Sequence, residues 1–150
     1  MQSAYSTKRS ILFMVILLVG VTVFYMFRGD WSVQFDFQNE TLTIDGPQGT
    51  LAAIPFEDIS AISYYEEMDV GTEVSGGTGY GYLYGEYTND ELGSYTLMCL
   101  KKLDCFLVVT DKDGNTYAAN MESKDTTYNL YTATKEYLDS LGYTDVVYSG

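Results

Sequence analysis

The sequence predicts an α+β domain, mostly of antiparallel strands with one C-terminal helix, preceded by a single transmembrane helix. Three observations predict this class. A long apolar stretch occupies residues 11–27, and short runs of alternating apolar and polar residues recur from residue 31 to residue 120. Apolar residues then recur at three- and four-residue spacing over residues 124–141, as expected for an amphipathic helix.

The first segment, residues 11–27, is apolar on every face, with Gly20 and Thr22 as its only breaks. A helix of this length spans roughly 25 Å, and Arg28 can extend it by snorkelling, so it can cross a bilayer core. A cleaved signal peptide is the competing interpretation, but the run ends in side chains too bulky for a small-x-small cleavage site. The predicted organisation is therefore a tail at residues 1–10, a transmembrane helix at 11–28 and a domain at 29–150.

The charges beside this segment predict its orientation. Lys8 and Arg9 precede the apolar stretch, and Arg28 alone follows it. Because positive charge favours the cytoplasmic side, residues 1–10 are expected in the cytoplasm and the domain outside it.

The predicted domain is strongly acidic. Residues 29–150 contain five lysines, no arginine and all 21 carboxylates of the chain, for a net charge of −16. This charge repels nucleic acid and anionic lipid headgroups, and it favours cations or basic partners unless it only keeps the domain soluble. The chain has no histidine, the commonest general base and zinc ligand. The sequence therefore predicts a non-catalytic protein with no cofactor and no metal site.

Four strands are expected before the glycine-rich part of the chain, at residues 31–37, 41–45, 51–54 and 59–65. Polar or glycine-containing turns at residues 38–40 and 46–49 separate the first three. In the fourth strand, alternation places Ile59 and Ala61 on one face and Ile62 and Tyr64 on the other.

Residues 68–90 break this pattern with six glycines. The first half, DVGTEVSGGTG, is expected to be a mobile loop, and the second half, YGYLYGEYT, an irregular strand with glycines at bends. Residues 76–81, GGTGYG, lack the lysine and the following helix of a phosphate-binding loop. The tyrosines of this segment form a candidate partner-binding surface, with ordinary sheet packing as the alternative. They are Tyr80, Tyr82, Tyr84 and Tyr87.

Two further strands, at residues 94–100 and 105–110, are expected to pair around residues 101–104. Asp113 and Gly114 predict a hairpin into residues 115–120. Ser123 is the expected N-cap of the helix and Gly142 its stop. The tail at residues 143–150 is expected either to pair as a strand or to fray.

Cys99 and Cys105 lie symmetrically about Lys102. If the chain turns symmetrically there, the two residues face each other across the strands, close to disulfide reach. An exported domain favours that disulfide, and two small buried hydrophobic side chains are the alternative.

Two groups of acidic residues are candidate cation sites. Asp111, Asp113 and Asn115 surround Gly114. A calcium-binding loop needs its glycine at position six, whereas Gly114 is at position four counted from Asp111. A hairpin turn is predicted instead. Acidic residues also gather before the glycines and could hold a weak cation, although a solvated loop is favoured. They are Glu66, Glu67, Asp69 and Glu73.

Several short motifs of the predicted domain occur in a characteristic order. Residues 54–62 read IPFEDISAI, which resembles the I-P-[FY]-x-D-I-x-x-I signature of bacterial pleckstrin-homology-like domains. The glycine-rich strand at 81–88, the hairpin TDKDGNTY at 110–117 and the helix residues Thr127, Leu130 and Tyr131 follow in the family's order. The resemblance covers about residues 32–141. It implies two nearly orthogonal sheets plugged by the C-terminal helix, and a binding or scaffold module.

Phosphoinositide binding is not carried over from that resemblance, because no basic residue occurs from Gly29 to Leu100. The predicted function is a membrane-anchored, non-catalytic module that binds another protein at the cell envelope. A carboxylate-dependent hydrolase of cell-wall polymers and a cation-responsive sensor are the alternatives.

Overall fold

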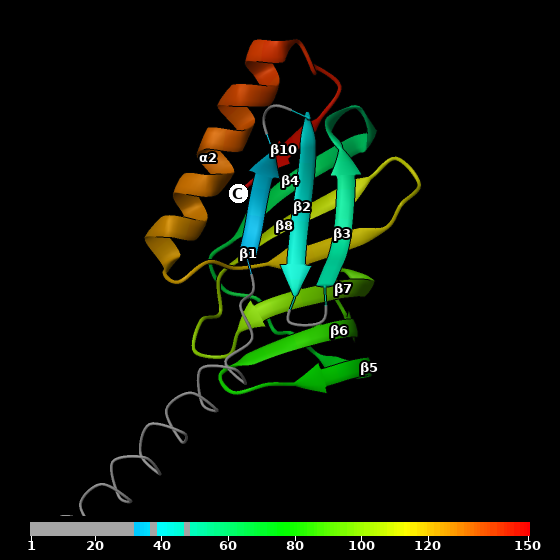
Figure 1. Ribbon diagram of the computed structural model, residues 1–150, viewed down its shortest axis with the longest axis vertical. Coiled ribbons are helices and arrows are strands. Elements are labelled where there is room, and N and C mark those ends of the chain that lie inside the picture. Colours follow the sequence, from blue (N-terminus) through cyan, green and yellow to red (C-terminus); the bar gives the residue numbers. More distant parts are fainter. Residues whose placement is uncertain (1–31, 37–38, 47–48) are drawn as a thin grey trace, which may run out of the picture. The chain divides into compact units, whose positions relative to one another are not determined.

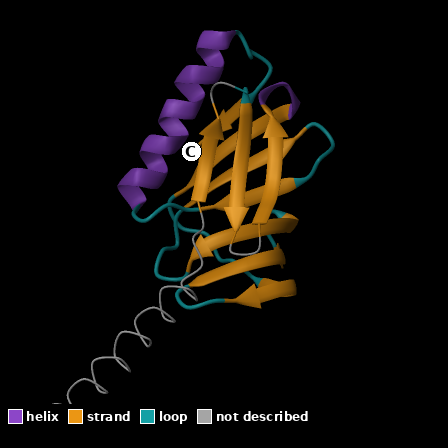
Figure 2. Cartoon of the chain, viewed as in Figure 1, coloured by secondary structure: helices purple, strands orange, loops and turns teal. Residues whose placement is uncertain are grey.

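The computed structural model describes residues 32–36, 39–46 and 49–150, which belong to one compact unit. These residues form ten strands and one α-helix, which confirms the prediction of a mostly-strand α+β fold with a C-terminal helix (Figure 2). Within the described residues no helix is long and apolar enough to cross a membrane. The predicted anchor at residues 11–28 lies outside them.

A small antiparallel sheet has the order β1-β2-β3. Its strands are β1 (Ser32–Asp36), β2 (Thr41–Gly46) and β3 (Gly49–Pro55). Leu42 of β2 pairs with Ile54 of β3, and both side chains are buried. A short 3₁₀ helix, η1 (Phe56–Asp58), then leads into the large sheet.

The large sheet has the order β10-β4-β8-β9-β7-β6-β5 (Figure 1). Its strands are β4 (Ile59–Tyr65), β5 (Thr72–Thr78), β6 (Tyr82–Asn89), β7 (Gly93–Leu100), β8 (Phe106–Asp111), β9 (Thr116–Ala119) and β10 (Val147–Ser149). Two pairs, β7 with β9 and β10 with β4, are parallel. The other strand pairs are antiparallel, as the prediction of a mostly antiparallel fold requires, and the C-terminal tail pairs rather than frays.

The helix α2 (Lys124–Leu141) begins and ends where the sequence predicts. The Ser123 side chain accepts a hydrogen bond from the Thr126 N–H, and Gly142 ends the helix in the left-handed conformation. The helix packs against β4 and β8 (Figure 1). Its buried face is narrower than predicted, because Tyr128 and Leu141 are exposed.

The two faces of the large sheet bury different residues. Leu107 and Val109 of β8 join a cluster with the small sheet and α2, whereas Phe106 and Val108 belong to a second cluster. This is the period-two alternation expected of a strand buried on both faces. Residues 66–71 connect β4, next to the β10 edge, to β5 at the opposite edge of the sheet, and their Met68 belongs to the second cluster.

A bulge in β4 changes its predicted faces. The register with β8 shifts between Ile59 and Ala61, and the Ser60 hydroxyl bonds the backbone oxygens of Thr110 and Asp111. Because the extra residue reverses the alternation, Ile59 and Ile62 enter the same cluster. The prediction that they lie on opposite faces is wrong.

The predicted hairpin between residues 94–100 and 105–110 is also wrong. Both segments are strands, but β9 lies between β7 and β8 and pairs with each of them. The turn that follows β7 is stabilised by a residue that directly follows β9. The buried Asn120 side chain accepts a 2.7 Å hydrogen bond from the Leu100 N–H.

Candidate functional site

The predicted tyrosine surface lies on the β5–β6 hairpin. Tyr80 lies between the two strands and is 83% exposed, the most exposed large hydrophobic side chain among the described residues. Tyr82 and Tyr84 of β6 are half-buried on one face, with ring centroids 6.0 Å apart. The structure therefore brings Tyr82 and Tyr84 together, packed against the first core cluster, and leaves Tyr80 exposed in the turn between β5 and β6.

Tyr87 does not belong to this surface. It is 3% exposed and lies in the second core cluster, since three residues along a strand from Tyr84 lead to the opposite face. Its hydroxyl donates a 3.3 Å hydrogen bond to Glu73. Burial, and then the neighbouring Glu73 carboxylate, raises the pKa of Tyr87 to about 12. The prediction that Tyr87 contributes to a binding surface is wrong.

The glycine-rich segment that was predicted to be a mobile loop is strand β5. Gly76 pairs with Gly85 of β6, and a Cβ on Gly85 would lie 2.5 Å from the Gly76 Cα and 2.3 Å from the Ser75 oxygen. Only glycine therefore fits at this close approach of the two strands. The prediction is wrong because it treated glycine as flexible, without the partner strand that constrains it.

Tyrosine rings cover two other glycines of the hairpin, Gly77 and Gly79. A Cβ on Gly79 would lie 1.9 Å from the Tyr82 ring, and one on Gly77 would lie 2.6 Å from the Tyr84 hydroxyl oxygen. An aromatic ring across the strands shields a glycine and compensates for the side chain it lacks. This packing fixes both rings and makes the hairpin an ordered surface.

Strand β5 is an edge of the large sheet, and in Figure 1 it extends beyond the small sheet. Six of its seven residues are exposed, including Val74 at 66%. The opposite edge, β10, has only three residues. An edge strand presents N–H and C=O groups that can pair with another chain. The β5–β6 hairpin thus combines an accessible edge with an exposed aromatic side chain.

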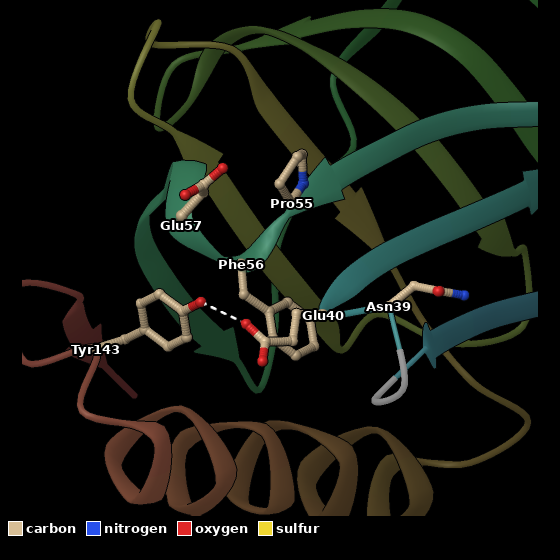
Figure 3. Close-up of a pocket in the computed structure, with 6 residues that line it drawn as sticks. All are labelled: Asn39, Glu40, Pro55, Phe56, Glu57 and Tyr143. Carbon is tan, nitrogen blue, oxygen red and sulfur yellow. Dashed lines mark hydrogen bonds between the residues drawn. The ribbon is translucent and has the colours of Figure 1, made fainter.

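A pocket of about 300 Å³ lies at the other side of the fold, where the β1–β2 turn meets the segment after α2 (Figure 3). Tyr143 donates a 2.7 Å hydrogen bond to the Glu40 carboxylate, which raises the pKa of the tyrosine. The Phe56 N–H donates a hydrogen bond to the backbone carbonyl oxygen of Glu40. Glu40 itself has a left-handed backbone conformation, with a φ of 50°. Glu57 completes the acidic lining and projects away from this pair (Figure 3).

This pocket bears on the hydrolase alternative. A glycosidase needs two carboxyl groups converging in one cleft, one of them with a raised pKa. Glu40 and Glu57 are both exposed, and none of the carboxylates from Glu40 to Asp145 is buried. The two carboxylates of the pocket are therefore in contact with solvent, whereas the acid of a glycosidase is typically held in an apolar environment.

The Asp111–Asn115 turn is held by its own hydrogen bonds. The Asp111 carboxylate accepts 2.8 Å bonds from both the backbone and the side-chain nitrogen of Asn115. Partial burial acts to raise the pKa of Asp111, but these bonds outweigh it and lower the pKa from its usual value. The carboxylate therefore serves the β8–β9 turn, as the predicted hairpin requires.

Within the described residues no group of three cysteine or acidic side chains is arranged to hold a metal ion. In particular, Glu66, Glu67, Asp69 and Glu73 do not converge, because β5 leads Glu73 away from the loop.

Cys99 and Cys105 are both free and buried. The symmetric hairpin that would have placed them face to face is absent, since β9 and Asn120 intervene. Strands separated by a third strand lie about 10 Å apart, beyond disulfide reach. Burial raises the pKa of the Cys99 thiol to about 12, which leaves it a poor nucleophile. The alternative of two buried hydrophobic side chains describes this structure.

Sequence reasoning missed two features of these sites. The pairing of Glu40 with Tyr143 joins residues 103 positions apart, and no local pattern encodes it. The edge strand had a signal that was not used, because Thr72, Val74 and Thr78 are β-branched residues within the glycine run.

We compared the chain with protein-family models, with curated proteins and with solved structures, and no match was found.

Proposed function

We propose that this chain is a membrane-anchored, non-catalytic binding module of pleckstrin-homology-like type, whose β5–β6 hairpin contacts a protein of the cell envelope. The observation that carries the proposal is the hairpin itself. Its edge strand is exposed, and Tyr80 is 83% exposed beside two rings fixed over glycines. Tyrosine provides a large contact area at low cost in side-chain entropy.

The pleckstrin-homology-like assignment is supported by the division into a small and a large sheet with a C-terminal helix. The parallel pairs β7–β9 and β10–β4 do not belong to a simple antiparallel meander, so the assignment depends chiefly on the motif order around residues 54–62. The anchor at residues 11–28 and the extracytoplasmic position of the domain depend on the apolar run and its flanking charges.

The location is tested by protease treatment of intact cells, followed by mass spectrometry of the released peptides. Peptides from residues 101–124 are expected before lysis if the domain lies outside the cytoplasm. Their release only after lysis, while a known surface protein is cleaved, would contradict the location.

The binding surface is tested by photo-crosslinking in living cells. A benzophenone amino acid is placed at Tyr80, and at Tyr128 as the control, because Tyr128 is 50% exposed on α2, away from the hairpin. We expect crosslinks to protein from position 80 and none from position 128. Absence of any protein crosslink at position 80, with full incorporation and expression, would refute the proposed surface.

A further inference from the structure

We infer that the partner of the β5 edge is a second copy of this chain, paired antiparallel about a two-fold axis at Gly77. This inference rests on the proposed function, because it names the protein that contacts the same hairpin. It also specifies which groups of the edge make the contact.

The hydrogen-bonding groups that face outward follow from the register of the hairpin. The Gly79 N–H donates to the Tyr82 oxygen at 3.0 Å, and Gly77 lies opposite Tyr84. Because successive residues of a strand point their backbone groups to opposite sides, the N–H and C=O groups of Gly76 and Thr78 face away from β6. A bulge between Glu73 and Ser75 ends the regular pairing at Val74, so the usable edge is residues 75–78.

This edge is complementary to itself. Around a two-fold axis at Gly77, Gly76 lies opposite Thr78 of the second copy, so the two outward-facing residues pair with each other. Beyond the paired residues, the same symmetry brings Val74, at the bulge, toward Tyr80 of the second copy, which lies in the turn after β5. These residues are 66% and 83% exposed, the two highest values among the large hydrophobic residues described in the structure. Because the axis is two-fold, the contact between Val74 and Tyr80 would occur twice in one dimer and would remove both side chains from solvent.

Charge follows the same symmetry. Glu73 would lie opposite Gly81 of the second copy. The oxygen of Gly81 accepts a 3.0 Å hydrogen bond from the Lys101 N–H, so the exposed Lys101 and Lys102 follow directly beside it. Antiparallel pairing therefore brings the Glu73 carboxylate of one copy toward the Gly81 end of the other, where Lys101 and Lys102 lie after β7, inward from the edge.

The opposing effect is the net charge of −16 on each domain. At physiological ionic strength such repulsion is screened beyond about 8 Å, so contacts at the edge can prevail. The contact is small, and confinement of both copies to one membrane raises their effective concentration. Self-association should therefore strengthen as salt is added, whereas binding of a basic partner should weaken.

The geometry is tested with spin labels on the full chain in detergent micelles. Cys99 and Cys105 are buried, so a label can be directed to the exposed position of Ser75→Cys. In the inferred dimer the two Ser75 positions are four residues apart along the pair, about 14 Å between backbones. A label at Leu141→Cys is the control, because α2 packs on β4 and β8 and its distance from the edge is at least four strand spacings, about 19 Å, in each copy.

The contacts are tested by exchanging charges and measuring the dimer dissociation constant by sedimentation. Glu73→Lys is expected to weaken the dimer about tenfold, since each dimer gains two like-charge contacts. Glu136→Lys, an equal change of charge on an exposed residue of α2, is the matched control and is expected not to weaken it. The double variant Glu73→Lys, Lys101→Glu is expected to restore the original constant, which a variant that only perturbs β5 would not do.

A short label distance at position 75, a long one at position 141 and rescue by the double variant would support the inference. A monomer at every concentration up to about 100 µM, a dimer whose position-75 labels are far apart, or binding that weakens with salt would overturn it. The crosslinking at Tyr80 separates this failure from that of the proposed function. If the chain is a monomer but position 80 still crosslinks to a different envelope protein, the inference of a dimer fails and the proposed function stands. If position 80 crosslinks to no protein, both the inference and the proposed function are refuted.

Discussion

The two ends of the large sheet are stabilised in different ways. At one end, β4 and β8 lie beneath α2 and the small sheet, and side chains such as Ile62 and Leu138 are 0% exposed. At the other end, β5 contributes no buried side chain and is held by backbone pairing and by tyrosine rings over its glycines. One sheet thus contains an apolar core and an edge that is free for contacts, and the two should respond differently to substitution.

The largest effect is expected at the helix-covered end. Leu138→Ala removes a fully buried side chain and leaves a cavity, at a cost of about 2–5 kcal/mol in the free energy of unfolding. Leu141→Ala, on the same helix but 42% exposed, should change stability by less than about 0.5 kcal/mol. Urea unfolding of both variants measures the difference, and equal losses would contradict the buried face assigned to α2.

Gly85→Ala tests the other end. Its φ is 122°, and the added Cβ would meet the backbone of β5. The substitution is therefore expected to lower the free energy of unfolding by about 1–3 kcal/mol and to separate β5 from β6. Hydrogen exchange should become faster for the amides of β5 and stay unchanged for those of α2. Gly81→Ala is the control, since its φ of 85° is also left-handed but its Cβ would meet nothing within 4 Å. Unchanged exchange in β5 would show that the close approach of the glycines does not hold the edge.

Alkaline pH should loosen the second core cluster, which lies beneath the edge. Burial raises the pKa of Cys99 from 9.0 to about 12, and burial together with Glu73 raises that of Tyr87 from 10.0 to about 12. Both groups lose a proton more readily in the unfolded chain, so their contribution is intact below pH 9 and is lost as the pH rises toward 12. Unfolding temperatures measured from pH 8 to 12 should fall across this range. Alkylation of Cys99 in the folded protein at pH 8 would contradict its burial.

The smallest effect on stability is expected at the exposed tip. Tyr80→Ser should alter the free energy of unfolding by less than about 0.5 kcal/mol, because the ring is solvated. The same variant should lose the crosslinks and weaken the self-association that depend on Tyr80. A large loss of stability would mean that Tyr80 supports the hairpin rather than serving as a contact.

The elements that sequence could predict are those whose signal is local. Alternation located β2, β7 and β8, and Ser123 and Gly142 marked the two ends of α2. Wherever a distant strand decides the outcome, local reasoning failed. Thr110 and Asp111 create the bulge at Ser60, and Gly85 makes an ordered strand of the glycines in β5.

The candidate site shows the same division. Composition makes Tyr80 a candidate contact residue, which stays a prediction, and the structure shows that its side chain is exposed. Tyr87 was included because the glycines obscured the alternation of β6, and counting from Tyr84 would have assigned it to the opposite face. The Glu40–Tyr143 pair was beyond prediction, since it joins the first turn of the domain to the segment after its last helix.

The position of β9 between β7 and β8 also has a consequence for synthesis. β7 and β8 leave the ribosome before β9, so the direct β7–β8 hairpin is the pairing first offered to the nascent chain. At typical elongation rates the eight residues from Lys112 to Ala119 take about 0.4–1.6 s, during which the place of β9 must stay vacant or be cleared. Asn120, whose side chain closes the turn beyond β7, is made last of this group. Completion of the sheet is therefore a late event, governed by the order of translation as well as by the final contacts.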